Sequence, residues 1–204
     1  MPAFTNPLVG MVQTRWDCSN RPAVFLDAHF VVEQAARAAC GLFFNFNGTA
    51  GIWRREALER AGGWSADTVT EGLDVSYRAQ MAGWLFVYLP QYSVKSELPE
   101  KVTAFKSQQR RWTKGGAQVM RKLLLTLITS SASISVKIEG FYHLTIGFVH
   151  FFLVLFSLAF VPFLILFGPV PEGSLWFVHP IVILGAGTST VIFFLVGQYC
   201  RERR

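Results

Sequence analysis

The sequence predicts a mixed α/β fold followed by long apolar segments, and three observations support this prediction. Short strand-like runs alternate with helical periodicity over residues 9–98. Hydrophobic residues make up 51% of the chain and the mean hydropathy is +0.35, which is high for a water-soluble protein. Two stretches without any charged residue, 144–167 and 175–199, each exceed the roughly 20 residues that a membrane-spanning helix needs.

The charge distribution favours a membrane surface and phosphate-bearing small molecules over nucleic acid. The net charge is +6, and apart from three arginines at the carboxy terminus every Lys and Arg lies at or before Lys137. These cations form no recognisable nucleic-acid motif, so no nucleic-acid partner is expected. The cysteines have no metal-ligand spacing and form no even framework, which predicts a reducing environment. They are Cys18, Cys40 and Cys200.

In the first part of the chain the residue pattern predicts a strand, a helix and a second strand. Residues 9–14 are mostly apolar and predict a strand inside a sheet, whereas residues 25–39 carry apolar side chains at helical spacing. Residues 41–46 predict an aromatic-rich strand that delivers the polar run Asn47-Gly48-Thr49 at its end. Polar groups at a strand end, followed by a helix, are typical of ligand sites in open α/β sheets.

The next part of the chain predicts two helices followed by two strands. The helices cover residues 54–61 and 72–81, and the strands cover residues 85–89 and 94–98. Gly62 and Gly63 allow the first helix to end in a left-handed conformation. The oxygens of Thr68 and Thr70 can cap the second helix. Pro90 is expected to end the strand at residues 85–89 and so to separate it from the strand at residues 94–98.

From Lys101 the pattern becomes helical again. We expect residues 101–140 to form an amphipathic segment that lies at the membrane interface and is broken at Gly115-Gly116. A soluble helix that faces a core fits the periodicity equally well. The uncharged stretches that follow favour the interfacial interpretation.

Residues 141–204 predict a transmembrane hairpin with spans at about 144–167 and 175–199 and a basic cytoplasmic tail. The connection between the spans contains Glu172 and no Lys or Arg, whereas arginines follow the second span. The positive-inside rule therefore predicts that both termini are cytoplasmic. The expected location is a bacterial inner membrane, in which the chain is a multi-pass protein.

Three polar signatures occur in a fixed order: 46–54, Thr70-Glu71-Gly72 and Gln108-x-x-Arg111-Trp112. With these signatures the chain resembles the membrane-embedded family 2 glycosyltransferases, which include cellulose synthases and mannan synthases. The signatures resemble, in order, the family's acceptor-side loop, its Thr-Glu-Asp motif and its Gln-x-x-Arg-Trp motif. The resemblance runs from about residue 7 to about residue 167. It implies that residues 1–100 are the acceptor-side part of a GT-A-like catalytic domain.

The resemblance also implies a role for each signature. The residues expected to contact the acceptor are Asn47, Gly48, Thr49 and Trp112, and those expected at the departing diphosphate are Gln108 and Arg111. An indole suits the apolar face of a sugar, and a guanidinium offers a planar cationic fork to a diphosphate. Two alternatives remain open: Asn47-Gly48 can be a plain turn, and the Arg-Trp pair can anchor a helix at headgroup depth.

The catalytic base is where the sequence departs from the family. Gly72 occupies the position of the family's catalytic Asp and has no side chain to accept a proton, and the sequence shows no turn that requires a glycine there. The nearby carboxylates are Glu71 and Asp74, but Asp74 lies about 200° from position 72 around a helix axis. Since general base catalysis is worth about 10²–10⁴-fold, its loss would leave slow transfer.

The donor side of the reaction has no counterpart in the sequence, which contains no Asp-x-Asp, no Asp-Asp pair and no Gly-rich phosphate loop. The resemblance implies Mg²⁺ or Mn²⁺ in a complete enzyme, with no metal ligand or cofactor in this chain. We therefore expect a carboxy-terminal fragment of a processive or glycolipid-type inverting glycosyltransferase, inactive alone. The complete enzyme would move a hexose from a nucleotide sugar to a glycan or lipid hydroxyl, in contact with membrane lipid. The alternative is a non-enzymatic partner or pseudoenzyme of a complete polysaccharide synthase.

Overall fold

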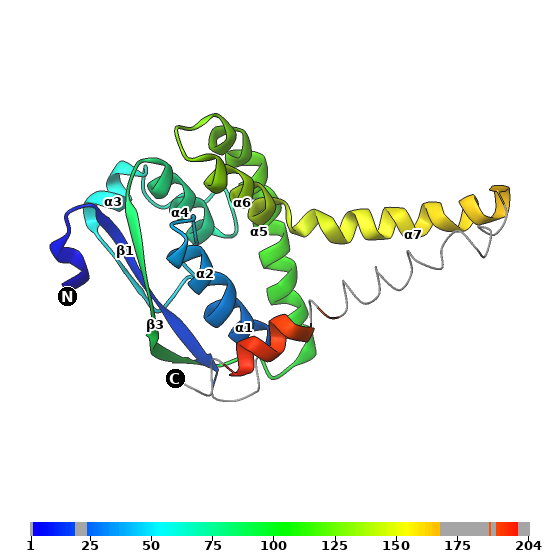
Figure 1. Ribbon diagram of the computed structural model, residues 1–204, viewed down its shortest axis with the longest axis horizontal. Helices are drawn as coiled ribbons and strands as arrows, with labels where there is room; N and C mark the ends of the chain where they lie inside the picture. The colour runs from blue at the N-terminus through cyan, green and yellow to red at the C-terminus, as the bar shows by residue number, and fades with distance from the viewer. Residues whose placement is uncertain (1, 19–23, 168–187, 189–190, 200–204) are drawn as a thin grey trace.

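The computed structural model describes residues 2–18, 24–167, 188 and 191–199, and it contains a small sheet packed against helices (Figure 1). The sheet has three strands in the order β2-β1-β3. These strands are β1 (Val9–Cys18), β2 (Gly51–Trp53) and β3 (Leu85–Ser96). The central strand β1 pairs antiparallel with β2 and parallel with β3.

The strand β1 confirms the strand predicted for residues 9–14, but β3 is one continuous strand where two were predicted. The register between β1 and β3 shifts after Thr14, so that Thr14 pairs with Leu89 and Arg15 pairs with Ser93. Pro90 falls within this irregularity, where a missing N–H does not break the ladder. The short strand β2 was not predicted.

The helix predicted for residues 25–39 forms as three consecutive pieces: α1 (Val24–Ala28), a π-helix η2 (His29–Glu33) and α2 (Gln34–Ala39). A short 3-10 helix, η1 (Pro2–Thr5), precedes the sheet. Phe30 packs with Met11 of β1 and with Phe44 in one buried cluster. Tyr88 of β3 donates a hydrogen bond of 2.8 Å from its hydroxyl to the Phe30 carbonyl, which fixes η2 against the sheet.

The strand predicted for residues 41–46 is wrong. The segment has no regular secondary structure and pairs with no strand of the sheet, and its backbone bonds instead to α4 (Glu71–Met81). Gln80 Oε1 accepts from Phe44 N at 3.2 Å, and Gln80 Nε2 donates to Phe44 O at 2.9 Å. Ser76 Oγ accepts from Phe46 N at 2.8 Å. Helix side chains thus satisfy the backbone groups that a sheet ladder would otherwise satisfy.

The helix α4 is the centre of the fold. One of its sides packs toward the sheet and the other packs toward two later helices (Figure 1). Val75 and Ala79 pack in one cluster that reaches α3 (Arg55–Arg60). Tyr77 packs in another cluster with residues from α5 (Val102–Thr129) and α6 (Ile134–Thr145). Gly62 and Gly63 after α3 have φ of 83° and 72°, which confirms the predicted left-handed end of that helix.

The helix α5 runs without a break through Gly115-Gly116, so the predicted break is wrong. A Cβ added to Gly115 would lie 2.3 Å from Thr70 Cγ2, whereas one added to Gly116 would meet nothing within 4 Å. Gly115 therefore lets α5 approach the residue that precedes α4, and Thr70 makes no side-chain cap. The second half of α5 buries apolar side chains, as the core-facing interpretation predicts, while most of its first half is exposed.

The helix α7 (Gly147–Phe167) extends away from the rest of the fold and exposes its apolar side chains (Figure 1). Within the described ranges, no single helix combines the length and apolarity of a membrane span; α6 and residues 147–160 meet both conditions only as a pair bent by 50°. A straight first span is therefore not supported. The predicted second span, 175–199, lies largely outside the described residues. Its last part, residues 191–199, is helical and reaches α1, where Gln198 Nε2 donates to Asp27 Oδ2 at 3.1 Å.

Candidate functional site

An open cavity of about 640 Å³ lies at the amino-terminal end of α4, and its size is typical of a small-ligand site. The lining residues are Phe46, Gly48, Trp64, Ser65, Ala66, Thr68, Glu71 and Gly72. The fold thus brings Gly48 of the first signature beside Glu71 and Gly72 of the second. Glu71 is exposed at this cavity, as a carboxylate that acts on a ligand must be.

The structure explains why position 72 is a glycine, which the sequence did not reveal. A Cβ at this position would lie 2.9 Å from Phe46 O and 3.8 Å from Gly48 N. Ser76 Oγ donates to Gly72 O at 2.6 Å and accepts from Phe46 N, so it ties the loop to the helix. The glycine therefore permits close contact between this loop and the start of α4. An Asp at position 72 would require the loop to move.

A buried glutamine holds the loop that follows Phe46. Gln13 Nε2 donates to the carbonyls of Thr49 and Ala50 at 2.9 and 3.0 Å, and Gln13 Oε1 accepts from Asn47 N at 3.3 Å. Ala50 has a φ of 59°, which is unfavourable for a residue with a Cβ. Asn47 Nδ2 donates to Gln34 Oε1 at 2.8 Å, so this side chain holds the loop. Neither Asn47 nor Thr49 lines the cavity.

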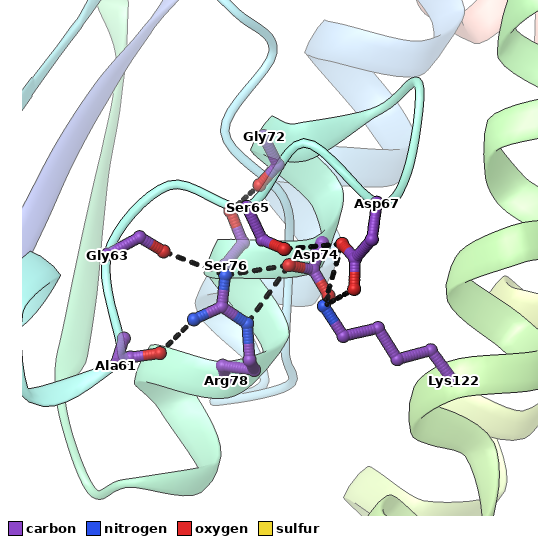
Figure 2. Close-up of polar contacts among 9 residues, drawn as sticks. All are labelled: Ala61, Gly63, Ser65, Asp67, Gly72, Asp74, Ser76, Arg78 and Lys122. Carbon is purple, nitrogen blue, oxygen red and sulfur yellow. Dashed lines mark hydrogen bonds and ion pairs between the residues drawn. The ribbon is translucent and has the colours of Figure 1, made fainter.

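Asp74, the other candidate base, lies away from the cavity in a network of charges (Figure 2). Its side chain is 0% exposed, with Arg78 Nη2 2.7 Å from Oδ2 and Lys122 Nζ 3.0 Å from Oδ1. Lys122 also lies 2.9 Å from Asp67 Oδ2. Burial lowers the pKa of Lys122, but its bonds to Asp67 and Asp74 outweigh this effect and raise the pKa above its ordinary value. Asp74 is therefore a structural anion, and both of its oxygens are engaged.

The loop between α3 and α4 is attached at both ends, in part by the same network (Figure 2). Arg78 donates to the carbonyls of Ala61 and Gly63, the latter at 2.9 Å. At the other end, Gln118 Oε1 of α5 accepts from Val69 N at 3.0 Å. Asp67 receives hydrogen bonds from Ser65 Oγ and Lys122 Nζ, which lower the pKa of its carboxyl. The loop is thus fixed to two helices.

The third signature lies apart from the cavity. Trp112 packs against the cluster around Met11 and Phe30, and Arg111 is exposed. Gln108 Oε1 is buried and has no hydrogen-bond partner among the described residues. Of the predicted site residues, Gly48, Glu71 and Gly72 therefore lie at the cavity, and the third signature lies on the first half of α5. Asn47, Thr49 and Asp74 belong to neither group.

The described residues do not fit a divalent cation. They contain no group of three or more His, Cys, Asp or Glu side chains that could hold a metal ion. Among the described residues, Glu71 is the one carboxylate that lines the cavity, and the nearby Asp67 and Asp74 are paired with Lys122. A single carboxylate is too few for the oxygen-rich coordination that Mg²⁺ or Mn²⁺ prefers.

Sequence reasoning missed Trp64, although it is 50% exposed and lines the cavity. The available signal was its position directly after Gly62-Gly63, in a loop between two predicted helices. An aromatic side chain on a loop that a rigid scaffold positions is a common feature of ligand sites.

Comparisons with known proteins identify the family. Residues 3–187 match the glycosyl transferase family group 2. The chain is 36% identical over 193 residues to the Probable glucomannan 4-beta-mannosyltransferase 10 of Arabidopsis thaliana, covering 88% of this chain and 35% of that protein. It is 35% identical over 206 residues to the Probable glucomannan 4-beta-mannosyltransferase 11 of the same plant, covering 94% of this chain and 46% of that protein.

A solved structure supports the fold. The mannosyltransferase PcManGT from Pyrobaculum calidifontis, in complex with GDP-Man and Mn²⁺, matches 95% of this chain and 54% of its own, with a TM-score of 0.55 and 16% identity. This likeness shows a mixed α/β, GT-A-like fold with a small sheet. These relatives give no support to a bacterial origin, and the chain spans less than half the length of the two plant proteins. The chain belongs to glycosyl transferase family group 2.

Proposed function

We propose that this chain forms the acceptor side of an inverting hexosyltransferase, processive or glycolipid-type, that builds a β-linked glycan from a nucleotide sugar. The observation that carries the proposal is the cavity at the start of α4, where Gly48 of one signature meets Glu71 and Gly72 of another. The names of the two plant relatives support mannose as the transferred sugar. They also favour an enzyme over a non-enzymatic partner.

Glu71 is the residue we assign as the base. Its carboxylate lines the cavity, and within the described ranges it has no ion-pair partner, in contrast to Asp74. It would accept the proton of the acceptor hydroxyl while the hydroxyl oxygen bonds to the sugar's anomeric carbon. The bond from that carbon to the nucleotide diphosphate would break at the same time, and the diphosphate would take the electron pair. Attack opposite the leaving group inverts the anomeric centre.

In this proposal, any divalent cation and most of the donor site belong to residues other than those that line the cavity. Three observations support this division: the sequence has no Asp-x-Asp, the cavity has a single carboxylate, and the chain spans 35% to 46% of the length of the two plant relatives. Gln108 and Arg111 would meet the diphosphate from the first half of α5. Trp112 would meet the acceptor farther along the glycan, because it does not line the cavity.

The test is a fusion of this chain to the amino-terminal half of the Arabidopsis relative numbered 10, assayed for mannose transfer from GDP-mannose. Glu71→Gln should lower the rate by about 10²-fold or more, because general base catalysis contributes that much. Glu59→Gln, on exposed α3 and paired with Arg55, is the matched control and should leave the rate unchanged. Equal rates for Glu71→Gln and its parent would contradict the assignment. A rise with Gly72→Asp alone would return the base to position 72.

We further propose that residues 141–204 form a membrane hairpin with both termini cytoplasmic. The uncharged stretches and the arginines that follow them support this arrangement, and the exposed apolar side chains of α7 agree with lipid contact. In oriented vesicles, Cys200 should react with an impermeant maleimide only from the cytoplasmic side, and a cysteine introduced at Ser174 only from the other side. Reaction of both from one side would overturn the hairpin.

A further inference from the structure

We propose that Trp64 is a stacking platform for a hexopyranose ring of the acceptor glycan. This inference rests on the proposed function, since it names the acceptor contact in the same cavity. None of the three sequence signatures contains Trp64.

The first observation is that Trp64 combines exposure with support. It is 50% exposed and lines the cavity, yet its ring contacts two other aromatic rings. The centroid distances are 6.1 Å to Phe46, at an interplanar angle of 57°, and 6.0 Å to Trp53, at 70°. Phe46 and Trp53 also contact each other, at 5.9 Å and 78°. Three mutually inclined rings are a favourable arrangement that holds the Trp64 indole in one orientation.

The second observation is that the loop is held on both sides of Trp64. Arg78 Nη2 donates to the Gly63 carbonyl on one side at 2.9 Å, and Lys122 Nζ lies 2.9 Å from the side-chain oxygen Oδ2 of Asp67 on the other. An indole that is already fixed loses little conformational entropy when a ligand covers it. The anchoring charges belong to the Asp74 network (Figure 2), so that network serves the cavity by positioning its aromatic side chain.

The third observation is the chemistry of the cavity lining. Glu71 is the only charged residue in the lining, and the other polar groups are hydroxyls, the indole N–H of Trp64 and backbone. A carboxylate repels a diphosphate but accepts hydrogen bonds from sugar hydroxyls. An aromatic face beside a hydrogen-bond acceptor matches a β-linked hexopyranose, which has an apolar C–H face and hydroxyls at its edge. The lining therefore favours a neutral glycan over the nucleotide sugar.

The experiment is titration of the purified 204-residue chain, in detergent or nanodiscs, with mannohexaose, followed by calorimetry and by tryptophan fluorescence. Trp64→Ala should weaken binding by about tenfold, the factor that corresponds to the upper end of aromatic stacking energies. Trp64→Phe should retain most of the affinity but lose much of the fluorescence change. Tyr92→Ala removes an aromatic side chain that is 61% exposed on β3 and outside the cavity, so it should bind like the parent.

The outcomes separate the two proposals. If mannohexaose binds the parent and Trp64→Ala equally, the stacking inference is overturned while the acceptor function stands. If the parent binds no mannohexaose at millimolar concentration, the acceptor assignment fails and the stacking inference fails with it. Retention of binding by Trp64→Phe, together with loss in Trp64→Ala, separates stacking from misfolding because both variants remove the same indole from the aromatic cluster.

Discussion

The first two turns of α4 present two regions with opposite properties. At the cavity, Glu71 is exposed and Gly72 offers no side chain at all. On the buried side, Asp74 and Arg78 are bonded to each other, to Lys122 and to the preceding loop. The two carboxylates, three residues apart, therefore differ in role: Glu71 is accessible to a ligand, whereas Asp74 is held in buried ion pairs.

This difference shows why a carboxylate near a family motif is not by itself a candidate base. Asp74 is 0% exposed and holds two cations, so proton transfer to it would break the contacts that fix the cavity loop. Glu71 lies at the first residue of the helix, where its side chain can reach the open space. Substitutions on one side of α4 that leave the other side unchanged test this difference between Glu71 and Asp74.

The largest effect is expected on the buried side. Asp74→Ala would leave Arg78 and Lys122 without their shared anion, and loss of one partner of a buried ion pair costs about 3–5 kcal/mol. Chemical denaturation should show a fall of about 3 kcal/mol in the free energy of unfolding. The control is Asp67→Ala, whose side chain is 55% exposed, so its loss should lower the stability much less than the loss of Asp74. Equal losses for the two variants would remove the distinction.

The next effect concerns the contact that fixes the start of α4. Gly115→Ala would drive a methyl group into Thr70, and such overpacking costs about 1–3 kcal/mol. Gly116→Ala is a matched control in the same helix, and it should stabilise the protein by about 0.5–1 kcal/mol because its Cβ meets open space. Thermal unfolding of both variants measures the difference. If both stabilise, α5 is not in close contact with Thr70.

A smaller effect is expected in the loop that borders the cavity. Ala50→Gly should raise the free energy of unfolding by about 0.5 kcal/mol, because the relief of its positive φ exceeds the added entropy of the unfolded chain. Ala38→Gly, in the regular helix α2, should lower it by about 1 kcal/mol. A loss of stability in both variants would mean that Ala50 is not strained.

The smallest effect on stability is expected at Glu71. Glu71→Gln should change the free energy of unfolding by no more than about 0.5 kcal/mol, as is usual for an exposed residue, since Glu71 has no ion pair in the part of the chain that the structure describes. The same substitution should weaken mannohexaose binding, since a neutral amide replaces a charged acceptor of hydrogen bonds. A large loss of stability without loss of binding would assign Glu71 to the fold.

Local patterns in the sequence were sufficient for the elements whose reasons are local. The strand at 9–14, the helices near 25–39, 54–61 and 72–81 and the start of a helix after Lys101 follow from periodicity and from glycine at a helix end. The three signatures were sufficient for the family, because their order and spacing lie in the sequence itself.

Tertiary contacts decided the rest. Residues 41–46 are not a strand because side chains of α4 bond to their backbone, and Gly115 does not break α5 because it lies against Thr70. Likewise, Asp74 forms an ion pair with Lys122, a residue 48 positions later in the chain. The loop that carries Trp64 is held by Arg78, which donates to the Gly63 carbonyl. Periodicity and motif spacing describe neighbours along the chain, whereas each of these outcomes depends on groups that only folding brings together.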